Sequence, residues 1–314
     1  MTTRSDQELF SGPVTYMGAP HATRPVGSKA AILGVPFDCG VHPVRIGSRL
    51  GPRAIREQSA LVRPFHPPLA DFNPLTRLNL VDCGDVRVTP SLVGESFAHI
   101  EEAARRIVDA GAIPVTMGGD GSVTLPQLRA VHRKYADLVV LHFDAHTDTY
   151  DMEGLNTATT FTRAAEEGVV DPANSFHIGA RGPVFMPGVF DHTRACGYNL
   201  IPGVEMMKRG IPDVLAEVRE RLAGRPAYLC FDMDFFDPSC APGVATPTWG
   251  GVSAREGLEL LQALSGLNFV AFDVNTVSPP HDVGGMTAFL AGTVMLECLF
   301  LACAAITPSN LPKP

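Results

Sequence analysis

Charged residues are scarce in this sequence, and basic residues form no cluster along it. Aspartate, glutamate, lysine and arginine make up 18% of the 314 residues, below the roughly 25% of an average soluble chain. The formal net charge is −8, and no run of lysine or arginine is present to contact phosphates or anionic lipids. The sequence therefore predicts no nucleic-acid partner and no membrane partner, and its low charge suggests that other subunits cover part of the surface.

Paired cysteine motifs and a secretory leader are also missing. The seven cysteines include no Cys-x-x-Cys pair, which favours reduced thiols over a disulfide framework. The first ten residues are polar and lack the apolar stretch of a signal peptide. These two features predict a cytoplasmic protein. Met286–Ile306 is almost wholly apolar, but Glu297 lies in its middle, where an acid costs about 2.5 kcal/mol or more in a membrane, so we expect a buried helix.

Eight short apolar runs with turn residues at their ends predict strands buried on both faces, as in a parallel sheet. They are residues 31–35, 78–81, 113–117, 138–143, 175–179, 199–201, 227–231 and 268–272. Helical patterns lie between them, at residues 94–110, 123–135, 211–222 and 253–264. Ser253 and Glu256 form a capping box at the start of the last helix. This alternation predicts a doubly wound α/β fold with a mainly parallel sheet of about eight strands.

The chain shows no internal repeat and no low-complexity linker. We therefore predict one domain, residues 26–314, preceded by an N-terminal arm, residues 1–25. In a doubly wound sheet the ligand site lies beyond the C-terminal ends of the strands. The sequence places four acids at or after such ends: Asp120, Asp144, Asp232 and Asp273.

Two short motifs at predicted strand ends indicate a metal site. Asp144, His146 and Asp148 alternate in one, and Asp232 and Asp234 alternate in the other. Because strand side chains have a period of two, we expect each set to converge on one side. A single Asp-x-Asp is more often a loop or a cap, but two sets at strand ends favour a metal. Four carboxylates and an imidazole suit Mn²⁺ or Ni²⁺, and two such ions would hold a hydroxide for hydrolysis.

Several segments resemble the ureohydrolase family, which includes arginase, agmatinase and guanidinobutyrase. They are residues 34–38 (Gly-Val-Pro-Phe-Asp), 51–56 (Gly-Pro-Arg-Ala-Ile-Arg), 118–122 (Gly-Gly-Asp-Gly-Ser), 144–148 (Asp-Ala-His-Thr-Asp), 231–234 (Phe-Asp-Met-Asp), 237–238 (Asp-Pro) and 241–243 (Ala-Pro-Gly). The resemblance implies a three-layer α/β/α fold, a trimer or a hexamer of trimers, and a dinuclear Mn²⁺ or Ni²⁺ site. It also implies hydrolysis of a C–N bond in a guanidine or related amidine.

Three positions depart from the pattern of that family. Gly121 stands where the resemblance implies a histidine that binds one metal ion. Thr157 stands where it implies a histidine that shuttles protons, and Thr276 stands where it implies a glutamate that pairs with the substrate cation. A neutral hydroxyl cannot pair with a guanidinium group. The three changes affect metal binding, proton transfer and substrate charge pairing.

The resemblance also implies which metal ligands this chain keeps. The second metal site keeps Asp144, His146, Asp232 and Asp234. The first keeps Asp144, Asp148 and Asp232 but loses its imidazole, so we expect partial or absent metal occupancy there.

These losses favour a non-catalytic subunit that partners an active ureohydrolase paralogue in a hetero-oligomer, a trimer or a hexamer. The arrangement resembles metformin hydrolase, in which an active nickel-dependent subunit pairs with a degenerate one, and the bond cleaved would be a guanidine or biguanide C–N bond. An active agmatinase-like amidinohydrolase with altered specificity is one alternative, with His281 as a replacement base. A guanidine-sensing regulatory module is another. His142 is expected to be a structural strand residue, with support of the metal ligands as the alternative. Trp249 is expected to be a packed loop anchor, with stacking on a substrate as the alternative.

Overall fold

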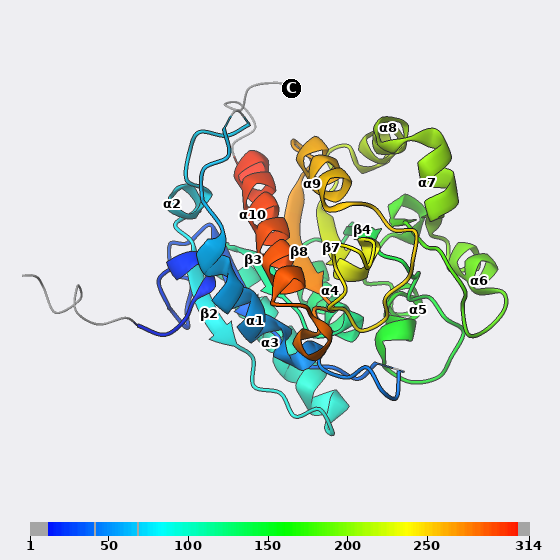
Figure 1. The fold of residues 1–314 in the computed structure, drawn as a ribbon. Coiled ribbons are helices and arrows are strands. Elements are labelled where there is room, and N and C mark those ends of the chain that lie inside the picture. The colour runs from blue at the N-terminus through cyan, green and yellow to red at the C-terminus, as the bar shows by residue number, and fades with distance from the viewer. Residues whose placement is uncertain (1–11, 41, 68, 307–314) are drawn as a thin grey trace, which may run out of the picture.

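The computed structural model describes residues 12–40, 42–67 and 69–306 (Figure 1). One sheet of eight parallel strands, in the order β2-β1-β3-β8-β7-β4-β5-β6, runs through the molecule. Its strands are β1 (Ala30–Gly34), β2 (Val81–Asp85), β3 (Ile113–Met117), β4 (Val139–Phe143), β5 (Phe176–Ile178), β6 (Asn199–Ile201), β7 (Ala227–Asp232) and β8 (Phe269–Asn275). The predicted α/β fold with about eight mainly parallel strands is confirmed.

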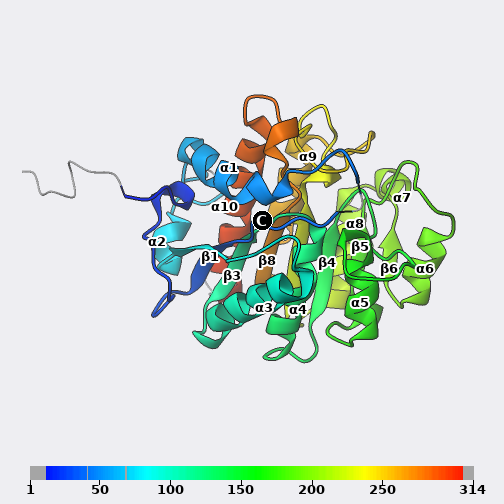
Figure 2. The same ribbon diagram turned by 90° about the horizontal axis from the view of Figure 1, so that it is seen from below.

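Helices cover both faces of this sheet, which gives three layers. They are α1 (Gly51–Gln58), α2 (Pro74–Leu78), α3 (Val93–Asp109), α4 (Thr124–His132), α5 (Thr160–Glu166), α6 (Val189–Ala195), α7 (Gly203–Arg209), α8 (Ile211–Leu222), α9 (Ala254–Ala263) and α10 (Met286–Ile306). Figure 2 shows α3, α4 and α5 on one side of the strands and α1, α9 and α10 on the other. Neighbouring strand residues supply the two cores in turn, because strand side chains alternate: Ile32 packs in one core and Leu33 in the other.

Helix α10 is the apolar segment expected to be buried, and the structure confirms that expectation. Among the described residues it is the one helix long and apolar enough to cross a membrane, but most of its side chains lie inside the protein. Glu297, in its middle, accepts a hydrogen bond of 3.1 Å from Gln262 and lies 3.3 Å from Nδ1 of His66. Polar partners therefore satisfy the acid within the helix layer.

The predicted strand at residues 78–81 is wrong. Leu78 ends α2, and the strand begins at Val81 with the polar sequence Val-Asp-Cys-Gly-Asp. This segment enters the sheet because Arg56 of α1 pairs with buried Asp82, at 2.8 Å from Nε and 2.9 Å from Nη2. A charge partner 26 residues away thus replaces the apolar side chains on which the prediction relied.

The segment before β1 packs against both α10 and β2. The hydroxyl of Tyr16, a fully buried residue, donates a 2.8 Å hydrogen bond to the Gly292 carbonyl, and its backbone N–H donates to Asp82 at 2.9 Å. Of the predicted arm, residues 1–11 lie outside the described residues.

Candidate functional site

The two acidic motifs meet at the C-terminal edge of the sheet, beyond the neighbouring strands β4 and β7. Asp144 follows the last residue of β4, and Asp232 is the last residue of β7. Strand alternation is not the reason that the side chains converge, so that part of the prediction is wrong. Residues 144–148 lie in a bend, where Asp148 has a positive φ of 49°, and Asp234 lies in the 3₁₀ turn Met233–Phe235. Turns, not a continued strand, bring these carboxylates together.

His146 lies between two carboxylates. Its Nδ1 is 3.2 Å from Oδ1 of Asp144 and 3.1 Å from Oδ2 of Asp234. Backbone groups hold the acids: the N–H of Ala145 donates to Asp234 at 3.1 Å, and the N–H of Asp234 donates to Asp232 at 2.7 Å. These contacts fix both motifs as one unit.

Burial sets the electrostatics of this group. It raises the pKa of Asp148 and Asp232 well above the ordinary value, and nearby carboxylates add to the effect. Burial also favours the neutral form of Asp144, but the adjacent histidines His142 and His146 outweigh it and hold the pKa of Asp144 low. Burial disfavours the charged form of His146, yet Asp234 and Asp144 raise its pKa well above the usual range. So many acids in one buried volume call for positive charge.

The donor atoms fit a divalent metal ion. One ligand atom each from Asp144, His146 and Asp234 lie within 4.8 Å of one another, and the same holds for His142, Asp144 and Asp148. Oxygen ligands with one imidazole suit first-row divalent metals such as manganese or nickel. The chain therefore carries a candidate metal centre at the sheet edge.

The loop at Gly121 offers no nitrogen ligand to this centre. A Cβ atom on Gly121 would lie 2.6 Å from Oγ1 of Thr157 and 2.8 Å from Oδ2 of Asp148. Thr157 thus fills the space in which a side chain at position 121 would begin. Two of the three departures from the family pattern, Gly121 and Thr157, therefore face each other across one small gap.

Thr276, the third departure, lies beside the acids. Its hydroxyl donates a hydrogen bond to Oδ1 of Asp232, and its backbone has a positive φ of 65°. A left-handed conformation is strained for a β-branched residue. Thr276 keeps this strained backbone without carrying a charge into the site.

A cavity of about 560 Å³ opens above the acids. Its wall includes Arg45, whose guanidinium group donates to the carbonyls of Pro242, Val244 and Ala245, at 2.7 to 3.2 Å. Tyr150 and Phe185 stack at the wall, with ring centres 4.6 Å apart and planes 3° apart. Sequence reasoning missed these residues, because no spacing or motif sets them apart from ordinary loop residues.

Cys39 also lines the cavity, but its thiol is not activated. Burial and the neighbouring Asp120 raise the pKa of Cys39 to about 12, and the thiolate is the reactive form of cysteine. All seven cysteines lie within the described residues, and none of them forms a disulfide.

Three other predicted positions, His281, Trp249 and Asp273, lie outside the cavity wall. His281 contacts Ser278, at 2.8 Å from Nδ1 to Oγ. Trp249 is 76% exposed, so the expected packed anchor is wrong. Asp120 lines the cavity, whereas Asp273 accepts a 2.6 Å hydrogen bond from Thr124 in the protein interior. The position of an acid at the end of a predicted strand therefore does not show whether its side chain faces the cavity or the protein core.

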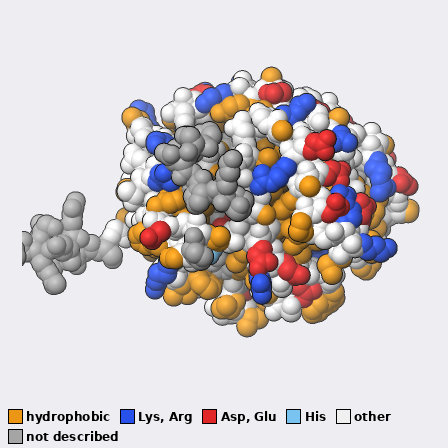
Figure 3. Space-filling view, turned by 90° about the horizontal axis from the view of Figure 1, so that it is seen from above, with side chains coloured by type: hydrophobic (Ala, Val, Ile, Leu, Met, Phe, Trp, Pro, Cys, Tyr) orange, Lys and Arg blue, Asp and Glu red, His pale blue; other side chains and the backbone are white. Residues whose placement is uncertain are grey.

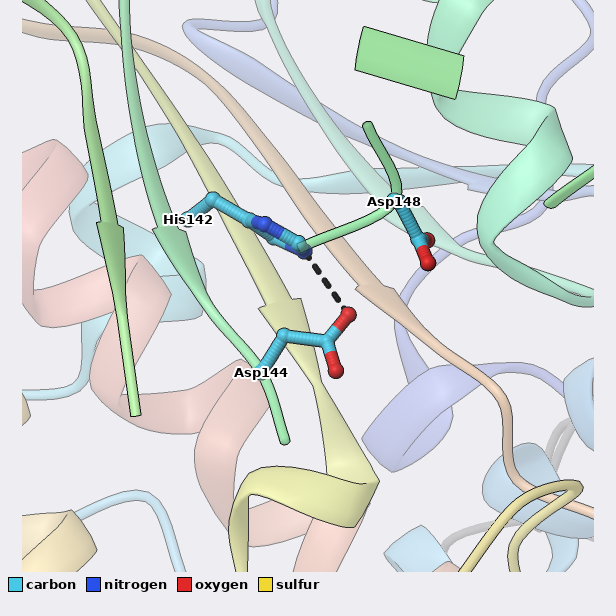
Figure 4. A group of neighbouring side chains, drawn as sticks. All are labelled: His142, Asp144 and Asp148. Carbon is cyan, nitrogen blue, oxygen red and sulfur yellow. Dashed lines mark ion pairs between the residues drawn. The ribbon is translucent and has the colours of Figure 1, made fainter. Parts of the chain in front are cut away.

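His142 contacts the acidic cluster, which agrees with the alternative that the sequence left open for it, and His177 was not anticipated. Nε2 of His142 lies 2.9 Å from Oδ2 of Asp144, and Figure 4 shows the ring reaching toward that carboxylate. Nδ1 of His142 lies 2.8 Å from Nδ1 of His177. Two histidines in two neighbouring predicted strands were a signal that could have revealed the pair.

Comparison with known proteins gives the family. The arginase family model matches residues 28–301. The chain is 39% identical to guanidinopropionase from Pseudomonas aeruginosa over 296 residues, which cover 93% of this chain and 92% of the relative. It is 37% identical to the mitochondrial guanidino acid hydrolase of Homo sapiens over 291 residues, which cover 92% of this chain and 82% of the relative.

The solved structures agree with the sequence relatives. Proclavaminate amidino hydrolase from Streptomyces clavuligerus aligns with a TM-score of 0.90 and 34% identity, covering 94% of this chain and 98% of that one. A hypothetical agmatinase from Burkholderia thailandensis aligns with a TM-score of 0.87 and 32% identity, covering 96% and 93%. The ureohydrolase resemblance is thereby confirmed, and the chain belongs to the arginase family.

Proposed function

We propose that this chain is a non-catalytic subunit of a ureohydrolase assembly. One observation carries the proposal: Thr157 lies in the space that a side chain at position 121 would need. An imidazole at position 121 would therefore require the Thr157 and Asp148 side chains to move as well.

The remaining chemistry of the site supports the same function. Hydrolysis of a guanidine needs water to add to the central carbon and a proton to reach the leaving amine before the C–N bond breaks. Thr157 stands where the family resemblance implies the proton-shuttling histidine. Thr276 stands where it implies the acid opposite the substrate cation, and its hydroxyl donates to Asp232 instead. Neither threonine supplies a proton-transfer group near neutral pH or a negative charge.

The residues that remain fit one metal ion better than two. We propose that Asp144, His146, Asp232 and Asp234 hold a single manganese or nickel ion, with weak or no occupancy beside Asp148. When bound, such an ion supplies charge neutralisation and Lewis acidity. Asp144 and Asp234 are the two acids that contact His146, so this set already has its ligands in mutual contact.

We propose that the partner is an active cytoplasmic paralogue in a hetero-oligomer, an arrangement like that of metformin hydrolase. Large apolar side chains are exposed on several elements, including Phe185, Met207 and Trp249. On the face drawn in Figure 3, hydrophobic side chains lie interspersed with charged ones. Exposed aromatic and methionine side chains are typical of subunit contacts, and they support this assignment.

Co-expression tests the proposal. The chain and its nearest paralogue are purified separately and together, with metal analysis and assays on guanidinopropionate, guanidinobutyrate, agmatine and a biguanide. We expect no turnover by the chain alone, one stable complex on co-expression, and a partner that is less active or less soluble alone. A turnover number above about 1 s⁻¹ for the isolated chain, an ordinary enzyme rate, would contradict the proposal. So would a paralogue that is equally active and stable without this chain.

An active amidinohydrolase with altered specificity is the second candidate, because the cavity above the acids is still about 560 Å³. The relatives include a guanidinopropionase, a guanidinobutyrase and agmatinases. With Thr276 in place of a charged residue, this candidate predicts a substrate that is less cationic than a guanidinium. Turnover of a neutral amidine by the isolated chain, with no turnover of agmatine, would favour it.

A further inference from the structure

We propose that His142 and His177 are positioning residues that together fix the orientation of the Asp144 carboxylate. The proposal concerns ion binding by this chain's own residues, so it holds for either candidate function. It starts from the register of the sheet, in which His142 of β4 pairs directly with His177 of β5. Paired residues on neighbouring parallel strands place their side chains on the same face.

The two imidazoles and Asp144 are joined by two consecutive short contacts. Nδ1 of His177 lies 2.8 Å from Nδ1 of His142. Nε2 of His142 lies 2.9 Å from Oδ2 of Asp144, the contact drawn in Figure 4. The second carboxylate oxygen, Oδ1, accepts the backbone N–H of His146 at 2.5 Å. Both oxygens of Asp144 are therefore held, one by the histidine pair and one by the backbone.

Hydrogen-bond accounting assigns the protons. Only one of the two Nδ1 atoms, 2.8 Å apart, carries the hydrogen between them. If His142 carried it as a neutral ring, a bare Nε2 would face a carboxylate oxygen, and His177 would keep a buried Nε2–H. Nε2 of His177 has no hydrogen-bond partner in the described part of the chain, and buried N–H groups without an acceptor are rare.

The opposite arrangement satisfies every donor. Nδ1–H of His177 donates to His142, and Nε2–H of His142 donates to Asp144. The unpartnered atom of His177 is then a bare nitrogen, which needs no acceptor. Burial lowers the pKa of His177 well below its ordinary value, which fits a neutral ring.

Aromatic side chains hold both rings in this geometry. Phe161 lies 4.4 Å from the His142 ring and 4.8 Å from the His177 ring, measured between centres. Tyr198 packs edge-on against His177, with ring centres 4.5 Å apart and planes at 89°. Because these contacts restrict the imidazoles, the orientation of Asp144 is set before any ion binds.

The rival interpretation makes His142 a metal ligand that replaces the imidazole missing at position 121. Ligand atoms of His142, Asp144 and Asp148 do lie within 4.8 Å of one another. A ligand role needs a bare Nε2 on His142, whereas a positioning role needs Nε2–H. The two interpretations therefore predict opposite tautomers, which can be measured.

The first experiment is a Co²⁺ titration of the full chain by calorimetry and visible absorption, with melting temperatures of the metal-free proteins. We expect His142→Phe to weaken Co²⁺ binding by about 10- to 100-fold, the usual effect of losing a partner behind a ligand. His142→Gln, which keeps an N–H near Nε2, should recover most of the affinity. The packing control Phe269→Leu, a buried residue at the start of β8 that contacts Phe272 and neither histidine, should lower the melting temperature and leave Co²⁺ affinity within about threefold.

The second experiment is ¹⁵N NMR of the histidine rings in the metal-free chain. We expect an Nε2–H signal for His142 and an Nδ1–H signal for His177. The opposite tautomers would establish the ligand role and overturn the proposal. It is also overturned if His142→Phe binds Co²⁺ as tightly as the wild type, or if the wild type binds no Co²⁺.

Discussion

The Thr157 hydroxyl lies against Gly121: a Cβ atom at position 121 would be 2.6 Å from the Thr157 hydroxyl oxygen. The two residues begin the 3₁₀ turns Gly121–Val123 and Thr157–Thr159, which precede α4 and α5. A change at one position therefore depends on the residue at the other.

A double-mutant cycle measures that coupling. We expect Gly121→Ala to destabilise the chain by about 1–3 kcal/mol, the usual cost of overpacking. In a Thr157→Ala background the cost should fall by at least about 0.5 kcal/mol, because the nearest atom of residue 157 becomes Cβ, at 3.9 Å, while the 2.8 Å contact with Oδ2 of Asp148 is the same in both backgrounds. Denaturant unfolding is the measurement. Gly94→Ala in α3, where a Cβ meets nothing within 4 Å, is the control, and equal costs in both backgrounds would contradict the coupling.

Metal content should distinguish the two halves of the acidic cluster. After dialysis against Mn²⁺ or Ni²⁺, we expect fewer than two ions per chain by elemental analysis. The reason is that the site beside Asp148 lacks an imidazole ligand, whereas the other site has His146. Asp234→Asn should abolish binding, since Asp234 contacts His146 at 3.1 Å. Asp148→Asn, the matched substitution in the other half, should leave the retained ion in place. Two tightly held ions in the wild type would show that Gly121 is tolerated.

Buried Asp273 should make stability depend on pH. Burial raises its pKa from 3.8 to about 6, so the folded state favours the protonated form. The stability contribution is therefore complete below about pH 4 and is lost as the pH rises through about 6. A shift of about two units corresponds to about 3 kcal/mol. Asp273→Asn should flatten the unfolding free energy between pH 4 and 6, and an unchanged slope would assign the dependence to other groups.

The ion pair between α1 and β2 should carry a large share of the stability of its region. Arg56→Met would leave Asp82 charged and buried without its guanidinium partner, and we expect a loss of about 3–5 kcal/mol. Arg53→Met, in the same helix, is the control, because the Arg53 pair with Glu57 lies at the surface and surface pairs contribute little. Similar unfolding free energies for the two variants would argue against this role.

Most strands were predictable because they are apolar on both faces, and the exception is instructive. The apolar run at residues 78–81 indicated a strand, but the sheet uses Val81–Asp85. A local pattern cannot show that Asp82 is neutralised by Arg56, since the two are distant in sequence. Charge pairing across the fold is therefore the information that the pattern lacked.

The candidate site was predictable in its acids and not in its surroundings. The Asp144 motif can be recognised from its composition and spacing. The turn that directs Asp148 inward depends on the positive φ of Asp148, which cannot be predicted from an aspartate in the sequence. The contact of His177 with His142 depends on strand register. Register is decided by the whole sheet, so a single segment does not reveal it.

The order of the strands has a consequence for synthesis of the chain. β8 comes last in sequence among the eight described strands, yet it lies between β3 and β7, so the other strands stay in two separate groups until β8 has been made and has paired. During that interval β3 and β7 each present an unpaired edge, the kind of surface that invites aggregation. Thr276 follows β8 directly and contacts Asp232. The acidic cluster therefore gains this neighbour only once β8 and the residue after it are in place.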